Sequence, residues 1–442
     1  MSGFYLPSEE DYDTSAEDFV HLEFTKERNY QHFDLPLNDD DRRRFADLSA
    51  HQAPHRFLPL LGYVDITLSY RRDADGNKKV SEKPRAIRFA SHEDAAYLQA
   101  YATELSTLYE ERLRQKHLAE AVLAYRPQNG TNIDQAKSLF DEIKVRQDCT
   151  VIAMDISGFF DCLNHGHLKS ELLALLGGSH LDGHHGSVWK NVTRYSWVET
   201  SDLDVVLGKK RQRRGRVCTP RDYKLNVQGR KNGLIRLHDA PYGIPQGTPI
   251  SGLYANIYML SFDQEMTDFF NSVGGSYRRY SDDIAVVMPG KVDEDEIIAK
   301  VEKHLADYEL AISGHKTDTA SFKNGLLTGS KPIQYLGFTF DGVVTLIRAS
   351  SLDSYRAKMN RGIHAKMVAA KAQGVRSNRV YAREALSRYT HVGKRRNFIK
   401  YAHRAADVHA SSEIRAQVSD HMKWFKKAWR RERMKVFSDL TE

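Results

Sequence analysis

The stretch RRYSDDIAVVM, residues 278–288, decides the fold of this chain, because two short strand-like runs flank a polar turn. The pattern predicts an antiparallel hairpin with Asp282 and Asp283 at its tip. Upstream, the apolar run TVIAM at 150–154 predicts a buried strand, and Asp155 follows it directly. A strand end and a hairpin tip place their side chains at one edge of a sheet, so these carboxylates are expected to lie together.

Carboxylates grouped at one sheet edge are what two hard Mg²⁺ ions need when they lie about 3.5–4 Å apart. We therefore interpret Asp155, Asp282 and Asp283 as metal ligands, with Mn²⁺ as a substitute metal. Such a pair of ions lowers the pKa of an attacking 3′-hydroxyl and stabilises a leaving pyrophosphate. Each acid alone would indicate only a polar turn or a strand end. Their order along the chain is what indicates nucleotidyl transfer.

The rest of the chain shows alternating strand and helix signals. YVDITLSYRR and KVSEKPRAIRF, around the turn DADGN, predict one hairpin, and IQYLGFTF and VVTLI predict another that turns at Asp341-Gly342. Residues 177–240 show no clear periodicity. The middle of the chain is therefore expected to form an α+β layer, with helices on one face of an antiparallel sheet. Helices are predicted over 93–122, 133–144, 167–176, 249–270, 293–310 and most of 350–436.

The composition is that of an ordinary globular protein: of 442 residues, 28% are charged and 41% are hydrophobic. The length suggests two or three domains, or subdomains around one large core. No apolar run approaches the ~18 residues that span a bilayer, and the N-terminus lacks a signal-peptide pattern. The cysteines are too few for a disulfide framework, and Cys218 with SHLDGHH at 179–185 fits no standard zinc pattern. We expect a cytoplasmic protein without a membrane partner.

Positive charge is concentrated in residues 355–404, which hold fourteen Lys or Arg and one acid, whereas 1–24 hold seven acids and no Lys or Arg. A segment this basic is typical of a surface for phosphate backbones, and a solvated helical face is the alternative. KKRQRRGR at 209–216 is either a contact with a structured RNA or an exposed flexible loop. The tail KWFKKAWRRERMK at 423–435 suits nucleic acid or an oligomer contact better than a membrane surface.

Three motifs together carry a family resemblance: AMDISGFFDCLNH at 153–165, GIPQGTPISGLYANIY at 243–258 and YSDD at 280–283. They resemble the palm motifs of reverse transcriptases, especially those of retrons, group II introns and bacterial abortive-infection systems. The resemblance extends through KPRAIRFASHEDAAYLQAY and AYRPQNGTN upstream, and through SGHKT and IQYLGFTFDG downstream. It covers roughly residues 60–345, about two thirds of the chain.

The resemblance implies a right-hand polymerase with an α+β fold. Its parts would be fingers, a palm built of an antiparallel sheet backed by helices, and an α-helical basic thumb. The implied boundaries are an acidic N-terminal extension at 1–55, fingers at 56–148, a palm at 149–348 with a basic insertion at about 177–240, and a thumb with a basic tail at 349–442.

Carried over position by position, the resemblance assigns further residues. Phe160 matches the aromatic gate that leaves no room for a 2′-hydroxyl, and a core position beside Phe159 is the alternative. Gln246 and Gly247 match the loop that packs against the incoming nucleotide and the template base. The other assignments are the Ile156 carbonyl as an extra metal ligand, Lys83 and Arg85 on the triphosphate, Lys316 as proton donor to pyrophosphate or as a plain surface lysine, and Tyr335, Leu336 and Gly337 on the primer end. From the basic segments come Arg211, Arg213, Arg214, Arg395 and Arg396 as nucleic-acid contacts.

The resemblance also implies a function, an RNA-directed DNA polymerase with an RNA template, dNTPs and a DNA product as partners. The segment SHEDAAYLQAYATELSTLYEERL favours the defence-associated bacterial reverse transcriptases, which implies an antiphage role and a dedicated non-coding RNA. Untemplated or protein-primed DNA synthesis of the abortive-infection type is one alternative, and a retron-type enzyme is another. A non-catalytic nucleic-acid-binding module is the third, and the complete set of acids and the intact PQG loop count against it.

Overall fold

The computed structural model of the protein describes residues 30–50, 54–72, 78–181, 183–208, 211, 215–229, 233–393 and 396–438. Several of the sequence-based assignments lie outside these ranges: the acidic segment 1–24, the DADGN turn, Arg213, Arg214 and Arg395. Lys83 is described by its backbone only. Within the described ranges, no helix is long and apolar enough to cross a membrane.

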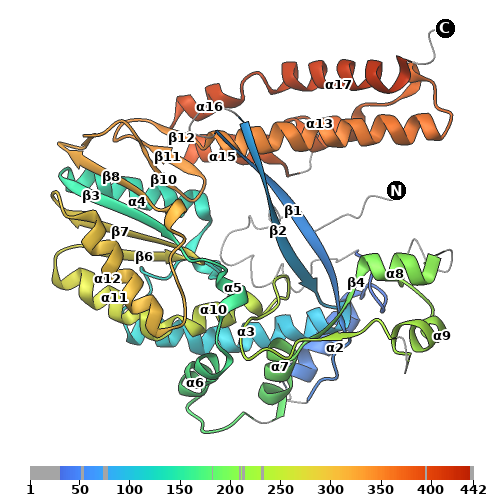
Figure 1. The fold of residues 1–442 in the computed structure, drawn as a ribbon, viewed down its shortest axis with the longest axis horizontal. Coiled ribbons are helices and arrows are strands. Elements are labelled where there is room, and N and C mark those ends of the chain that lie inside the picture. The colour runs from blue at the N-terminus through green and yellow to red at the C-terminus, as the bar shows by residue number, and fades with distance from the viewer. Residues whose placement is uncertain are drawn as a thin grey trace.

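A five-stranded antiparallel sheet forms the centre of the molecule, at the left of Figure 1. Its strand order is β6-β7-β3-β8-β9, so β3 is paired on both edges and its residues are buried along nearly its whole length. The predicted hairpin at 276–289 and the predicted buried strand are both confirmed. The strands are β3 Cys149–Asp155, β6 Ser276–Tyr280, β7 Asp283–Pro289, β8 Asp318–Lys323 and β9 Leu326–Leu327.

Both faces of this sheet are covered, because side chains alternate from face to face along β3. Ile152 and Met154 join one core, together with helices α3, α6, α10, α11 and α12. Val151 and Ala153 join a second core on the opposite face, together with helix α4 and the C-terminal helices. The sheet is therefore backed by helices as predicted, but the expectation that they occupy one face only was wrong. The bounds are α3 His92–Gln115, α4 Asn132–Arg146, α6 His165–Leu176, α10 Ser251–Tyr258, α11 Leu260–Ser272 and α12 Glu294–Asp307.

Two of the predicted helices differ from the structure. The helix expected at 93–122 ends at Gln115, because His117 adopts a left-handed conformation with φ 55° that a continuing helix cannot contain. The helix expected at 249–270 is two helices, α10 and α11, which meet at Met259. Met259 is buried within the first core, so packing rather than a glycine or proline marks the break.

A second sheet has four strands in the order β2-β1-β4-β5. Strands β1 (Leu60–Arg72) and β2 (Lys78–Phe89) pair over their whole length and form the long arm in the middle of Figure 1. Residues 177–240, which showed no periodicity, supply β4 (Ser196–Glu199) parallel to β1, and β5 (Arg236–Leu237). Helix α8 Thr200–Leu207 packs against β1 and β4, and the other helices of these parts of the chain are α2 Asp39–Ala50, α7 Gly183–Thr193 and α9 Pro220–Asp222.

The C-terminal part begins with a three-stranded sheet and continues as helices. The unbroken strand expected at 333–340 was wrong, because Leu336 (φ 45°) and Gly337 (φ 89°) make a tight turn inside it. The turn at Asp341 is confirmed, since its carboxylate accepts from the N–H groups of Val343 and Val344 at 2.9 and 2.7 Å. The elements are β10 Ile333–Tyr335, β11 Phe338–Phe340, β12 Thr345–Ile347, α13 Ala349–Ala372, α14 Arg383–Tyr389, α15 Phe398–Val408, α16 Ser412–Val418 and α17 His421–Phe437. The whole is the predicted α+β fold of fingers, palm and helical thumb.

Candidate active site

Three acidic residues meet at one edge of the central sheet, as the sequence predicted. Asp155 ends β3 and lies directly opposite Asp283, the first residue of β7. The carbonyl of Asp282 accepts a hydrogen bond of 2.9 Å from the N–H of Ile156. The carbonyl of Asp155 in turn accepts from Ser313 at 2.7 Å, which ties the strand end to the segment before Lys316.

These carboxylates are crowded enough to disturb each other's protonation. Burial, and next to it the charges of Asp282 and Asp155, raise the pKa of Asp283 to about 7. Burial and Asp155 also raise the pKa of Asp282. Lys316 makes an ion pair with the Oδ1 atom of Asp155. The charges of Lys316 and Arg85 oppose the rise in the pKa of Asp282, and those of Lys316 and Arg348 oppose the rise in the pKa of Asp283. Like charges gathered in a half-buried place are stabilised by a bound cation.

The donor set suits a hard divalent ion, because it consists of carboxylate oxygens from two adjacent strands. Among the described residues, no three His, Cys, Asp or Glu side chains are already arranged around a single metal position. In this conformation Lys316 engages Asp155, so metal binding requires these side chains to reorient. Ile156 uses its N–H for the hydrogen bond to Asp282, and its side chain is buried in the first core. The residues present therefore suit a hard cation in their chemistry, and the two-metal arrangement stays a prediction.

A buried arginine that the sequence analysis missed holds the acidic turn. The guanidinium of Arg279 is fully buried and donates to both carboxylate oxygens of Asp263 on α11, at 2.8 and 2.6 Å. It also donates to the Asn256 side chain at 3.2 Å and to the carbonyl of Ser281 at 3.0 Å. Ser281, the residue before the two acids, has a left-handed φ of 60°. Arg279 thus ties the strained turn at Ser281 to helix α11, on the buried side of the sheet edge.

Tyr125 holds the same turn from the other side. Its hydroxyl lies 3.0 Å from the Ser281 hydroxyl, and its ring meets the ring of Phe160 edge to face at 6.4 Å. The ring lies against Gly252 of α10, where a Cβ atom would come within 2.6 Å of it. Any larger residue at this position would clash with the Tyr125 ring. The position of Tyr125 therefore explains why Gly252 stands in the motif PISGLY. The signal available in the sequence was Tyr125 itself, within AYRPQNGTN.

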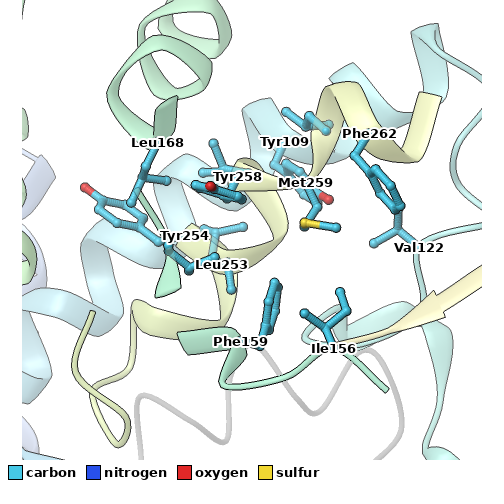
Figure 2. Packing of buried hydrophobic residues seen from close by; sticks show 14 of the residues in the cluster. Tyr109, Val122, Ile156, Phe159, Leu168, Leu253, Tyr254, Tyr258, Met259 and Phe262 are labelled. Carbon is cyan, nitrogen blue, oxygen red and sulfur yellow. The ribbon is translucent and has the colours of Figure 1, made fainter. Parts of the chain in front are cut away.

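The two phenylalanines of helix α5 (Phe159–Cys162) point in different directions. Phe159 is 3% exposed and lies in the first core with Ile156, Leu253 and Met259 (Figure 2). Phe160 is only partly buried and meets Phe159 edge to face at 5.5 Å. Phe160 also packs against the first core, so the structure supports the core alternative as well. Its role as a gate against a 2′-hydroxyl stays a prediction.

The PQG loop joins the palm to the fingers arm. The carbonyl of Gln246 accepts from the N–H of Arg88 on β2 at 2.7 Å. Gly247 has φ 113°, and a Cβ atom there would lie 2.9 Å from the Arg88 carbonyl, so the position requires glycine. At the other end of this segment, the N–H of Ile244 donates to the Phe160 carbonyl at 2.9 Å. Gln246, Gly247 and Phe160 are therefore parts of one connected surface.

The predicted triphosphate cations lie on β2. Lys83 and Arg85 both belong to strand β2, two residues apart. The Arg85 side chain is exposed, and its charge acts to lower the pKa of Asp282. The structure thus brings Arg85 within electrostatic reach of the acids.

The remaining predicted residues are spread more widely. Tyr335 is buried, whereas Leu336 and Gly337 form the half-buried turn of the β10–β11 hairpin. The Leu336 carbonyl accepts from the Asn132 side chain at 3.1 Å. Arg211 is half-buried and paired with Asp204 of α8, and Arg396 is exposed in the thumb. The structure does not bring these two arginines to the acids.

The chain is similar to a known protein family in sequence and to solved structures in fold. A family model described as "Reverse transcriptase (RNA-dependent DNA polymerase)" matches residues 77–340. No curated protein matches the chain by sequence. Similar solved structures include apo telomerase from Candida tropicalis truncated from its C-terminal domain, with a TM-score of 0.39 and 10% identity over 71% of this chain and 61% of that one. Telomerase from Candida albicans with a TWJ fragment of telomeric RNA has a TM-score of 0.36 and 12% identity over 90% and 66%. The chain therefore spans about 61% of the first of these structures.

Proposed function

The chain belongs to the reverse transcriptase family, and on that premise we propose that it is an RNA-templated DNA polymerase that adds dNTPs to a primer end by two-metal nucleotidyl transfer. The observation that carries the proposal is the pairing of Asp155 with Asp283 across two strands, with Asp282 beside them. The raised pKa of Asp283 supports it, because a site that is strained without cations is suited to bind them.

Asp155, Asp282 and Asp283 are the proposed metal ligands, with the Ile156 carbonyl as a further oxygen. Two Mg²⁺ ions, or Mn²⁺ in their place, would lower the pKa of the primer 3′-hydroxyl and stabilise the charge on the leaving pyrophosphate. Lys316, which pairs with Asp155 in this structure, would give a proton to the pyrophosphate. The protein supplies position and charge, and no protein nucleophile is needed.

Residues on the fingers and on α5 would select the substrate. Arg85, with its planar guanidinium, is suited to bind phosphate oxygens in pairs, and Lys83 adds charge on the same strand. Phe160 would lie under the sugar and exclude a 2′-hydroxyl, since Phe159 already fills the core position. Gln246 and Gly247 would contact the incoming nucleotide and the template base.

The proposed division of the chain follows the same lines. We assign the fingers to 56–148, the palm to 149–348 with its insertion at about 177–240, and the thumb to 349–442, after an extension at 1–55. The strands of the insertion, β4 and β5, join the sheet of β1 and β2, so the insertion packs on the fingers. The turn at Tyr335, Leu336 and Gly337 would grip the primer end. The proposed backbone contacts are Arg211, Arg213, Arg214, Arg395 and Arg396.

A finer proposal concerns the biological role. We propose a bacterial defence-associated enzyme that copies a dedicated structured RNA into DNA, on the ground of the resemblance of the segment beginning SHEDAAYLQAY to that class. Untemplated or protein-primed synthesis, or a retron-type reaction, would use the same acids.

Primer extension tests the proposal. The purified protein should extend a DNA primer annealed to a defined RNA template, and the product should be the complement of that template. No incorporation with either Mg²⁺ or Mn²⁺ would refute the polymerase assignment. Incorporation whose sequence ignores the template would favour the untemplated alternative. Sequencing RNA and DNA that co-purify with the protein then tests the dedicated RNA, which should appear together with its DNA complement.

A further inference from the structure

Helix α17 is an amphipathic helix with one face packed on α13. Its buried residues recur at helical spacing: His421, Phe425, Ala428, Glu432 and Val436. Two contacts fix the pair of helices. The guanidinium of Arg356 on α13 lies 4.0 Å from the centre of the Trp424 ring, and Lys371 on α13 donates to the Val436 carbonyl at 2.8 Å.

The opposite face of α17 is exposed and basic. We call it the outer face and define it by five exposed residues: Lys423, Lys426, Lys427, Arg430 and Arg433. Most of these are three or four residues from another member, so they share one side of the helix. Lys423 pairs with Asp420, but the other four make no ion pair with any residue that the structure describes. The one acid within the helix, Glu432, is buried and bonded to His364 and Arg431.

The outer face points away from the acidic sheet edge. Figure 1 shows α17 on the side of α13 that is remote from the palm and from the β1–β2 arm, and α13 separates it from them. A duplex held at Asp155 and Asp283 would contact α13 before it could contact α17. The cations of the outer face are therefore available to a different stretch of nucleic acid.

We propose that the outer face of α17 is a second nucleic-acid site, which binds the phosphate backbone of base-paired RNA outside the active site. The inference deepens the proposed function, on which it rests, by giving a structured template RNA a place to be held while another part is copied. Cations that recur each helical turn, every ~5.4 Å, present a continuous row to a polyanionic backbone. Among the residues that the structure describes, Lys426, Lys427, Arg430 and Arg433 have no acid as an ion-pair partner, so their charge is free to meet phosphates.

The observations favour RNA over a membrane surface. A helix that lies on a bilayer exposes large apolar residues to the acyl chains. On α17, Phe425 is buried and Trp424 and Trp429 are partly buried, whereas Met434 is the large apolar residue that is mostly exposed, at 72%. The outer face offers charge without an apolar surface to insert.

The test compares two charge-neutralised forms of the full chain. One carries Lys426→Gln, Lys427→Gln and Arg430→Gln on the outer face. The matched control removes the same charge elsewhere, with Lys169→Gln, Lys291→Gln and Lys303→Gln, three exposed lysines of the palm. Affinity for a blunt RNA duplex is measured by fluorescence anisotropy over a series of salt concentrations. Extension of a short RNA–DNA primer–template is measured on the same samples.

For the outer-face variant, we plot the logarithm of the RNA affinity against the logarithm of the salt concentration. The slope should be shallower than that of the wild type by about 2–3, because each lost phosphate contact removes ~0.9. The control should keep the wild-type slope. Both variants should extend the short primer–template within about twofold of the wild type, which also shows that they fold. Equal slopes in the two variants would overturn the proposal. The proposal would also be overturned if the outer-face variant kept the wild-type RNA slope but lost binding to phosphatidylserine vesicles. The outer face would then be a membrane contact. Failure of the wild type to extend any primer would refute the polymerase assignment and leave the RNA slopes to be judged separately.

Discussion

Replacing Arg279 with Met should separate the stability of the palm from the placement of its acids. In the wild type, Arg279 makes four hydrogen bonds while fully buried, two of them to Asp263, which is also fully buried. Removing one partner of a buried ion pair leaves the other charge uncompensated and costs about 3–5 kcal/mol of unfolding free energy. A second substitution, Asp263→Asn, removes that orphaned charge and can still accept the Tyr277 hydroxyl, which now donates to Asp263 at 2.7 Å.

The double variant should therefore regain at least half of the lost stability, measured by urea unfolding. It should not regain activity, because the Ser281 carbonyl still lacks the donor that fixes the turn before Asp282. The readout is the Mg²⁺ concentration that gives half-maximal incorporation, which should rise about tenfold or more in both variants, a cost of ~1.4 kcal/mol in metal binding.

Arg278 provides the matched control for this experiment. It is the neighbouring residue of β6 and pairs with Glu142 on the other side of the sheet. Arg278→Met should lower stability without moving the Mg²⁺ dependence. If the Arg279→Met, Asp263→Asn protein takes up Mg²⁺ and incorporates dNTPs like the wild type, Arg279 serves packing alone and our account of the turn is incorrect.

Three further outcomes are expected. The double substitution Asp282→Ala, Asp283→Ala should abolish dNTP incorporation, because the metal ions lose two of their ligands. The circular dichroism spectrum and the melting temperature should stay near wild type, because removing carboxylates that repel each other at a turn costs little stability. Normal primer extension by this variant would contradict the metal assignment. Phe160→Ala should admit rNTPs: a clash of a few kcal/mol between the ring and the 2′-hydroxyl corresponds to roughly a hundredfold preference for dNTPs, which this variant should lose. Phe159→Ala should instead lower the free energy of unfolding by about 3–5 kcal/mol, because Phe159 is a core residue. Competition between rNTPs and dNTPs, together with urea unfolding, distinguishes the two variants. Finally, the pKa of Asp283 is raised from its ordinary 3.8 to about 7, so between these values the metal-free folded protein binds a proton that the unfolded chain does not. Its unfolding free energy in EDTA should therefore fall as pH rises through this window, and Mg²⁺ should bind more weakly below about pH 7; an Asp283→Asn protein with the same pH dependence would show that another group is responsible.

The central acids could be predicted because their signals are local. The hairpin at Asp282 and Asp283 is coded by two adjacent runs of strand residues, and the β3 strand before Asp155 by a single apolar run. Gly337 was a local signal for the turn between β10 and β11, since a glycine inside a strand often marks a bend. The sequence analysis did not use it and predicted one long strand.

Other features depend on residues that are far apart in the chain. Strand β4 pairs with β1 across more than 130 residues, from Leu60 to Trp197, and nothing in the local pattern of 177–240 indicates it. Arg279 looked like one more basic residue of a basic chain, and only its enclosure by α10 and α11 shows that it is buried and paired. Periodicity identifies which residues face a core, but it does not identify the buried polar partner that a distant helix supplies.

The hydrogen bond between Arg88 and Gln246 has a mechanical consequence. It fastens the PQG loop to the same strand that carries Arg85, and Gly247 lets the two backbones touch without a side chain between them. If the β1–β2 arm swings when a triphosphate is drawn in, the loop is pulled along with it. In the proposed reaction, binding of the triphosphate and selection of the correct base would then depend on one movement of the β1–β2 arm. A mismatched base would therefore oppose the closing of the arm.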